Sequence, residues 1–245
     1  AELKDITEDW ATLSLMGPRS RDVLEQVVVA DVSNDTFPFS TYQDIQIAGH
    51  TVRALRVTYM GELGWELHMP IEVSGEIYDA LHNAGQTFGI ANAGYRAIES
   101  LRLEKGYRAW GADITPSDSP LEAGLGWAVK LNSNIPFLGR DAVEAMTNSV
   151  KNKDLCCFTV DDPEVVLSGR ESILRNGIPV GYLSSAGWGY TIGKNIGYGY
   201  VRDNKGVNRG YLEAGSYELE VACERVTCEI HFIPLYDPMM ERIKV

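Results

Sequence analysis

The sequence lacks an apolar run of roughly 18 residues, the length that a helix needs to cross a bilayer, so no membrane span is predicted. A basic stretch followed by an apolar segment is also missing, so we predict no signal peptide. Four cysteines in 245 residues are too few for a disulfide scaffold, and we expect buried or inert thiols. Because no histidine lies at metal-finger spacing from them, no metal site is predicted.

Cationic residues are also scarce. Lys and Arg number 22 against 34 Asp and Glu, which gives a net charge of −12. Nucleic-acid binding depends on cationic neutralisation of phosphates, so this balance disfavours it, and it disfavours an anionic membrane surface for the same reason. With 44% hydrophobic and 23% charged residues, the composition is that of an ordinary globular protein of one or two domains.

Several catalytic motifs are absent. The chain contains neither G-x-S-x-G nor G-x-x-x-x-G-K-[S/T]. The glycines between Gly187 and Gly193 do not follow the G-x-G-x-x-G spacing, and no βαβ unit is predicted around them. The sequence therefore predicts neither a nucleotide-phosphate loop nor a nucleophile elbow.

The first 150 residues alternate between strand and helix patterns. We predict strands at 10–16, 44–47, 52–57 and 121–131, with a Gly-bent hairpin at 59–69. Helices are expected to start after Gly17-Pro18, at Ser74 as N-cap, at Gly94 and at Gly139, the last with Ala142, Val143 and Met146 inward. After about residue 150, short runs such as Cys156–Val160 alternate with Gly-rich turns, which indicates a small antiparallel barrel or sandwich.

The segment Tyr59–Glu66 places an aromatic hydroxyl and a carboxylate near the two ends of the predicted hairpin. On the outgoing strand, Glu66 and His68 share the face opposite the apolar residues. A cavity-facing Glu66 is suited to accept paired N–H donors from a heterocycle. The alternative is an exposed strand face with both side chains in water.

A second segment, Tyr95–Tyr107, carries Arg96 near a helix N-terminus, where the macrodipole disfavours a cation. This placement indicates an anionic partner, which is either an internal carboxylate or a ligand carboxylate. Glu99 and Arg102, three residues apart, are expected to form a solvated pair on the helix surface.

Three motifs in order resemble the aminomethyltransferase (glycine-cleavage T-protein) superfamily. They are Tyr59–Glu66 (YMGELGWE), Gly94–Gly106 (GYRAIESLRLEKG) and Ser119–Leu131 (SPLEAGLGWAVKL), and Phe137–Arg140 (FLGR) is similar to a further stretch of that family. Within the superfamily, these motif sequences most resemble the folate-binding half of sarcosine dehydrogenases. Dimethylglycine dehydrogenases and a pyruvate dehydrogenase phosphatase regulatory subunit look like close relatives.

The resemblance implies an α+β fold, with a mixed α/β cloverleaf region at 1–150 followed by a C-terminal antiparallel β-barrel domain at 151–245. It also implies that tetrahydrofolate sits in a central funnel. Glu66 would pair with the pterin, Tyr59 would line the pocket, and Arg96 would support the pocket or the acidic tail of the ligand. Trp127 matches a tryptophan that shapes the site, and Tyr107 is a further candidate.

The activity implied by the resemblance is the one-carbon-accepting part of a sarcosine dehydrogenase-like flavoenzyme, which forms 5,10-methylene-tetrahydrofolate from an amine-derived intermediate. The FAD domain of the parent chain would be its partner, in the mitochondrial matrix of a eukaryote or the cytoplasm of a bacterium. The alternative is a non-catalytic regulatory subunit with the same fold.

The resemblance departs from the family pattern at two places. The FAD domain is not among these residues, and the family's catalytic aspartate precedes the segment that matches Ala1. We therefore expect a portion of a longer chain, and the sequence identifies no catalytic base.

Overall fold

The computed structural model describes residues 2–245, and the chain divides into two compact units. The sheet unit contains the residues up to Ile98 together with Asp237–Val245, and the barrel unit contains Glu99–Tyr236. Helix α3 (Tyr95–Lys105) carries the chain from one unit into the other. No helix among residues 2–245 is long and apolar enough to cross a membrane.

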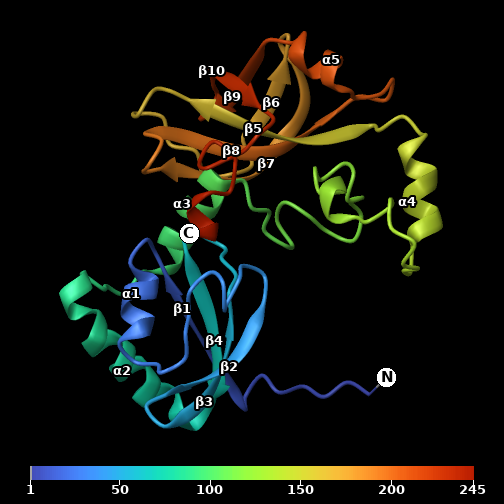
Figure 1. The fold of residues 1–245 in the computed structure, drawn as a ribbon. Helices are drawn as coiled ribbons and strands as arrows, with labels where there is room; N and C mark the ends of the chain where they lie inside the picture. Colours follow the sequence, from blue (N-terminus) through green and yellow to red (C-terminus); the bar gives the residue numbers. More distant parts are fainter. Residues whose placement is uncertain (1) are drawn as a thin grey trace. The chain divides into compact units, whose positions relative to one another are not determined.

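Four antiparallel strands form the sheet unit, in the order β1-β4-β3-β2 (Figure 1). They are β1 (Trp10–Met16), β2 (Tyr42–Ile47), β3 (His50–Leu55) and β4 (Gly64–Pro70). The predicted strands at 10–16, 44–47 and 52–57 are thus confirmed in kind, with end shifts of a few residues. A two-residue turn joins β2 to β3, where Ala48 (φ 50°) and Gly49 (φ 84°) both adopt the left-handed conformation typical of tight hairpins.

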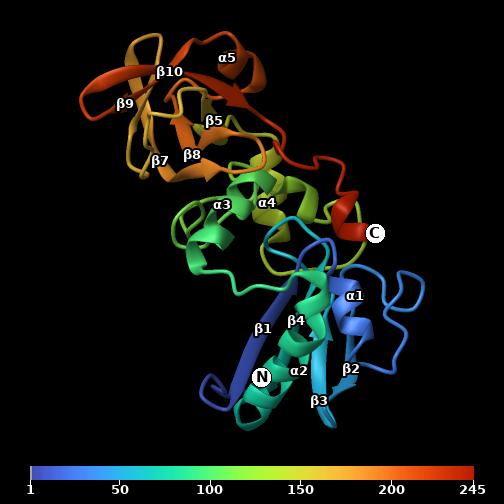
Figure 2. The same ribbon diagram turned by 90° about the vertical axis from the view of Figure 1, so that its left-hand side faces the viewer.

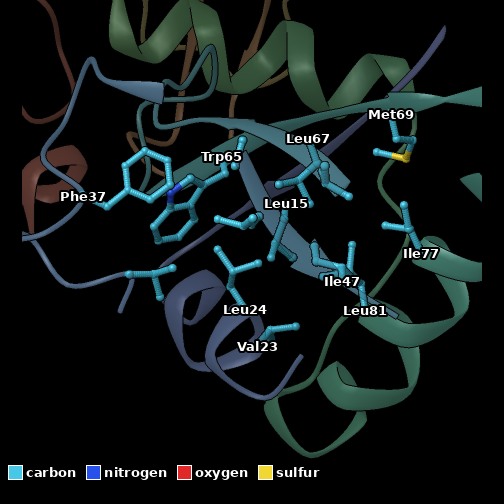
Figure 3. Close-up of a cluster of buried hydrophobic side chains, with 14 of the residues drawn as sticks. Leu15, Val23, Leu24, Phe37, Ile47, Trp65, Leu67, Met69, Ile77 and Leu81 are labelled. Atoms are coloured by element: carbon cyan, nitrogen blue, oxygen red, sulfur yellow. The ribbon is translucent and has the colours of Figure 1, made fainter. Parts of the chain in front are cut away.

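One face of this sheet is buried against two helices, α1 (Ser20–Glu25) and α2 (Ser74–Gly85). Figure 3 shows the helix residues Leu24 and Ile77 pointing toward strand residues such as Leu67. Apolar residues recur along α2 at helical spacing, while strand residues alternate, so both periodicities bring their apolar faces to one core. Burial of this face stabilises the unit, and the opposite sheet face stays polar.

A buried cation anchors the end of the chain in the sheet unit. Arg56 is only 1% exposed and donates to the main-chain oxygens of Phe37 (2.6 Å) and Val245 (2.8 Å). Its guanidinium also lies 5.7 Å from the ring centre of Trp65. Burial lowers the pKa of Arg56 to about 10, so the hydrogen bonds act against a real desolvation cost.

Six antiparallel strands close into the barrel of the second unit, in the order β10-β5-β8-β7-β6-β9. The strands are β5 (Lys153–Val160), β6 (Ser172–Arg175), β7 (Ile178–Gly189), β8 (Lys194–Arg202), β9 (Tyr217–Val221) and β10 (Glu224–His231). Closure leaves no free sheet edge, which decides the earlier choice between barrel and sandwich. The short helix α5 (Arg209–Glu213) lies against the barrel in both ribbon views (Figure 1, Figure 2), with Leu212 in its core.

Two strand predictions are wrong. Residues 59–63 form a bend and not a strand, and β4 pairs with β1 and β3 in place of its own preceding segment. Residues 121–131 form turns and a short 3-10 helix, η3 (Gly126–Ala128), because apolar residues there are interrupted by glycine and find no strand partner.

Two details of the predicted helices are also wrong. Val73 is the N-cap of α2, and the hydroxyl of Ser74 donates to the carbonyl of Ile71 and caps no helix N–H. Helix α4 (Arg140–Thr147) begins as predicted, but it buries no residue, and Met146 is 41% exposed. Helix α3, in contrast, begins directly after Gly94 as predicted and is followed by Gly106 in the left-handed conformation (φ 74°).

Candidate functional site

The polar face of the sheet unit carries the first candidate residues. On β4, Trp65, Leu67 and Met69 are fully buried, whereas Glu66 and His68 point to the opposite face. The side chains of Glu66 and His68 are 32% and 31% exposed. Glu66 is therefore neither sealed in the core nor freely solvated, and its carboxyl group is accessible on one side without the cost of full burial.

A surface hollow of about 280 Å³ lies at strands β2 and β3 of this sheet. It is lined by Ser40, Thr41, Tyr42, Arg53, Leu55 and Val57. Leu55 is the register partner of Glu66, and directly paired residues of neighbouring strands project from the same face. Glu66 thus shares a sheet face with Leu55 of the hollow, whose walls combine apolar, aromatic and polar side chains as ligand pockets do.

The carboxylate of Glu66 has acceptor capacity to spare. Among residues 2–245 its one polar contact is with His68, whose Nε2 lies 3.4 Å from Oε2. An ionised carboxylate offers about four lone-pair sites, so most remain free for a ligand. Such a group can accept two parallel N–H bonds from a planar heterocycle, which are charge-assisted and stronger than neutral ones.

The two other candidates in this unit are Tyr59 and Arg96. Tyr59 is partly buried in the bend that precedes β4. Arg96 is exposed at the second position of α3, and no side chain or carbonyl among residues 2–245 pairs with it. The internal carboxylate that we considered for Arg96 is thus missing from the described part of the chain, which leaves its charge available to an anion.

The remaining candidates, Tyr107 and Trp127, belong to the barrel unit. Tyr107 is partly buried, and its carbonyl accepts a hydrogen bond of 3.2 Å from Arg102. Trp127 lies in η3 and is 73% exposed. A large exposed aromatic side chain is available for stacking, but its own position is not fixed by packing.

Sequence reasoning missed a buried ionic network in the barrel unit. Arg102 is 1% exposed, and its Nη1 lies 2.5 Å from the carboxylate of Asp113, itself 1% exposed. Asp113 also accepts hydrogen bonds from the hydroxyls of Ser184 (2.5 Å) and Ser185 (2.6 Å) on β7. The predicted solvated pair of Glu99 with Arg102 is wrong in its setting, since Arg102 donates to Glu99 (2.7 Å) from a buried position.

This network joins segments that are far apart in the sequence. Asp113 also accepts from the N–H of Ala109 (2.9 Å), so helix α3, the loop after it and strand β7 meet at one carboxylate. Nearby, Glu104 is 1% exposed and accepts from the N–H groups of Thr191 (2.6 Å) and Ile192 (3.0 Å). Asp113 and Oε1 of Glu104 are thus occupied by the protein itself and hold the architecture together.

Three of the four cysteines are buried. Cys156, Cys157 and Cys228 are buried and Cys223 is exposed, all as free thiols. Burial raises the pKa of Cys157 and of Cys228 to about 12, which keeps both as unreactive thiols at neutral pH. Within residues 2–245, no cluster of three or more His, Cys, Asp or Glu side chains is arranged to hold a metal ion.

Two family models match consecutive parts of the chain. The GCVT N-terminal domain matches residues 1–133, and the glycine cleavage T-protein C-terminal barrel domain matches residues 153–237. The second range contains all six barrel strands, which end at His231.

Two similar curated proteins are much longer than this chain. Mouse mitochondrial sarcosine dehydrogenase is 46% identical over 99% of the chain, which corresponds to 27% of that protein. Human mitochondrial dimethylglycine dehydrogenase is 40% identical over 82% of the chain and 23% of that protein. The chain thus spans about a quarter of the length of these relatives.

A solved structure shares the fold. Glycine cleavage system aminomethyltransferase T from Bartonella henselae superposes with a TM-score of 0.76, at 24% identity, over 94% of this chain and 60% of that one. The expected α+β architecture with a C-terminal antiparallel barrel is thereby confirmed.

Proposed function

The chain belongs to the GCVT N-terminal domain family, and from that premise we propose that it binds tetrahydrofolate and serves as the one-carbon-accepting part of a sarcosine dehydrogenase-like flavoenzyme. The product would be 5,10-methylene-tetrahydrofolate, formed from the amine-derived intermediate of demethylation. The observation that carries the proposal is the accessible, largely unpaired carboxylate of Glu66, on the sheet face where its register partner Leu55 lines a surface hollow.

Glu66 fits the heterocyclic end of a folate. The pterin ring is planar, with adjacent N–H donors, and a carboxylate matches such a pair with two charge-assisted bonds. We assign Tyr59, which precedes β4, to the wall of the same pocket. In the barrel unit we assign Trp127 and Tyr107 to contacts with the ligand, as aromatic surfaces for its flat rings.

Arg96 fits the anionic end. A folate carries glutamate carboxylates, and the chain has a net charge of −12, so its overall field opposes the approach of such a ligand. At physiological salt this repulsion is screened over about 8 Å, so one local cation can still secure the tail. Arg96 is exposed and unpaired among the described residues, which suits it to that role.

In this proposal, residues 1–150 form the folate-binding region and 151–245 the C-terminal barrel domain, within the mitochondrial matrix for a eukaryotic parent or the cytoplasm for a bacterial one. FAD, which supplies the oxidation of the amine, would be held by a part of the parent outside this sequence. The residues present here orient the folate and shield a reactive intermediate from water, and we assign none of them as catalytic base.

Calorimetric titration with 5-formyl-tetrahydrofolate tests the proposal. We expect binding well below millimolar Kd, and Glu66→Ala should weaken it by about 1–3 kcal/mol because a charged hydrogen-bond partner of the ligand is lost. Glu76→Ala is the matched control, since that glutamate pairs with His50 (3.0 Å) on the same unit and should leave affinity unchanged.

Absence of binding at millimolar ligand, with circular dichroism showing a folded chain, would contradict the proposal. The regulatory-subunit alternative is tested on the full parent chain, by asking whether sarcosine is demethylated and folate becomes 5,10-methylene-tetrahydrofolate. A parent that binds folate but demethylates no amine would favour the regulatory alternative.

A further inference from the structure

A histidine adjoins the proposed ligand carboxylate on the open face of the sheet. His68 lies two residues after Glu66 on β4, and its Nε2 is 3.4 Å from Oε2 of Glu66. On the other side of the ring, Nδ1 lies 3.0 Å from the hydroxyl of Thr12 on β1. Thr12 is the register partner of His68, so the strand pairing itself sets this contact.

The two neighbours of the ring favour one tautomer. An ionised carboxylate accepts hydrogen bonds and cannot donate one, whereas a threonine hydroxyl can do either. The consistent arrangement therefore places the proton on Nε2, toward Glu66, while the hydroxyl of Thr12 donates to Nδ1. At 3.4 Å, Nε2 lies within contact distance of the carboxylate but beyond the length of a normal N–H···O hydrogen bond.

The position of Nε2 allows His68 to contact Glu66 but not a ligand. Nε2 is enclosed and has no well-aligned acceptor among the described residues, although 31% of the side chain is exposed. The exposed part of the ring is therefore not this nitrogen, so a ligand on the sheet face cannot reach it. Glu66 is the nearby acceptor that can satisfy this buried donor.

Other charges on this face do not compete for the carboxylate. Arg53 on β3 is the register partner of His68, but its guanidinium pairs with Asp44 on β2 at 3.0 and 3.3 Å. Ser14 on β1, opposite Glu66, is neutral. His68 is thus the group that can fix the rotamer of Glu66.

We propose that His68 is a positioning residue, held by Thr12, that orients the Glu66 carboxylate for the ligand through its Nε2–H. This inference rests on the proposed folate site for its consequence, but the pairing itself exists without ligand. Orientation of a carboxylate before binding saves the entropy of ordering it, so loss of His68 should weaken affinity without unfolding the sheet.

Long-range ¹H–¹⁵N correlation spectra of the ligand-free chain test the pairing. We expect the ring nitrogens of His68 to report the Nε2–H tautomer, and Glu66→Gln and Thr12→Val each to shift the ring toward a mixture of tautomers. An Nδ1–H tautomer in the unsubstituted chain would overturn the inference, whether or not the chain binds folate.

Calorimetry with 5-formyl-tetrahydrofolate tests the consequence. His68→Leu should weaken binding about five- to tenfold, the effect of one lost net hydrogen bond, with the midpoint of urea unfolding little changed. His68→Gln, whose amide can donate from a similar position, should restore affinity to within about threefold. His50→Leu removes another His–Glu pair of the same unit and serves as control.

The outcomes separate the two proposals. If the unsubstituted chain binds no folate, the proposed function fails, while the tautomer spectra still decide the pairing. If it binds folate and His68→Leu leaves the affinity unchanged, the positioning role is wrong and the folate site stands.

Discussion

The sheet unit and the barrel unit are both built from antiparallel strands, yet they differ in how exposed their polar side chains are. The sheet keeps one face open, and Glu66 and His68 on that face are each about one third exposed. The barrel closes on itself, and Arg102 and Asp113 beside it are each 1% exposed and fully engaged with the protein. Open polar groups with spare capacity are available to a ligand, whereas occupied buried ones hold the fold together.

The largest expected effect comes from opening the buried network of the barrel unit. Arg102→Ala should lower the free energy of unfolding by about 3–5 kcal/mol, because it leaves the carboxylate of Asp113 buried without its cation. Urea unfolding followed by circular dichroism measures the change. Arg225→Ala, which removes an exposed arginine 3.8 Å from Glu218, should change it by less than about 1 kcal/mol.

Equal effects of these two substitutions would contradict the distinction between buried and exposed ion pairs in this unit. Full binding of folate by a folded Arg102→Ala chain would sharpen the comparison, since it would separate the network from the ligand site.

A smaller effect is expected from crowding the barrel wall. A Cβ at Gly181 of β7 would lie 1.9 Å from the carbonyl oxygen of Tyr200 on β8, and a backbone atom cannot move aside as a side-chain tip can. Gly181→Ala should therefore destabilise the chain by about 1–3 kcal/mol. A fall in thermal midpoint measures it, and an unchanged midpoint would contradict the close strand contact.

Gly75 is the matched control for that substitution. It lies in α2 of the sheet unit, and a Cβ added there would meet nothing within 4 Å. Gly75→Ala should be neutral or stabilise by up to about 1 kcal/mol, because alanine favours the helix.

The smallest expected effect concerns acid stability of the barrel. Burial lowers the pKa of His231 below its ordinary value of 6.5, although Glu229 opposes the shift. The unfolded chain then binds the proton more readily, so this residue costs stability as the pH falls through the region just below 6.5. His231→Asn should lessen the loss of unfolding free energy between about pH 7.5 and pH 5.5.

Glu229→Gln sharpens that test in the opposite direction. Removal of the nearby carboxylate, 3.7 Å from Nε2 of His231, takes away an attraction that favours the protonated ring. The loss of stability on acidification should therefore grow, and a smaller loss would contradict the assigned cause.

Local pattern was enough for elements whose apolar periodicity is regular. The partial alternation along residues 10–16 predicted β1, and the helical spacing of Ile77 and Leu81 predicted α2, in which both residues are buried. The pattern also put Glu66 and His68 on the face opposite Trp65. It failed for 121–131, where apolar residues between glycines fit a strand or a loop equally well.

Partner choice was beyond local pattern. β4 fits one arm of a hairpin by its sequence, but its neighbours are β1, which begins 54 residues earlier at Trp10, and β3. Likewise, Arg102 has the spacing of a solvated helix pair, but its buried partner network includes Ser185, 83 residues away. Nothing within a few residues of either one signals the contact.

The sequence by itself determined the family motifs, the acidic balance, the main helices and strands, and the face on which Glu66 lies. Periodicity left a barrel or a sandwich open, and the family resemblance pointed to the barrel that the structure shows. Tertiary structure alone decided that Arg102 is buried and that Thr12 stands beside His68. The reason is physical: periodicity records which side of an element meets apolar surroundings. Which distant polar group completes a hydrogen bond depends on strand order and register, which form only when the whole chain folds.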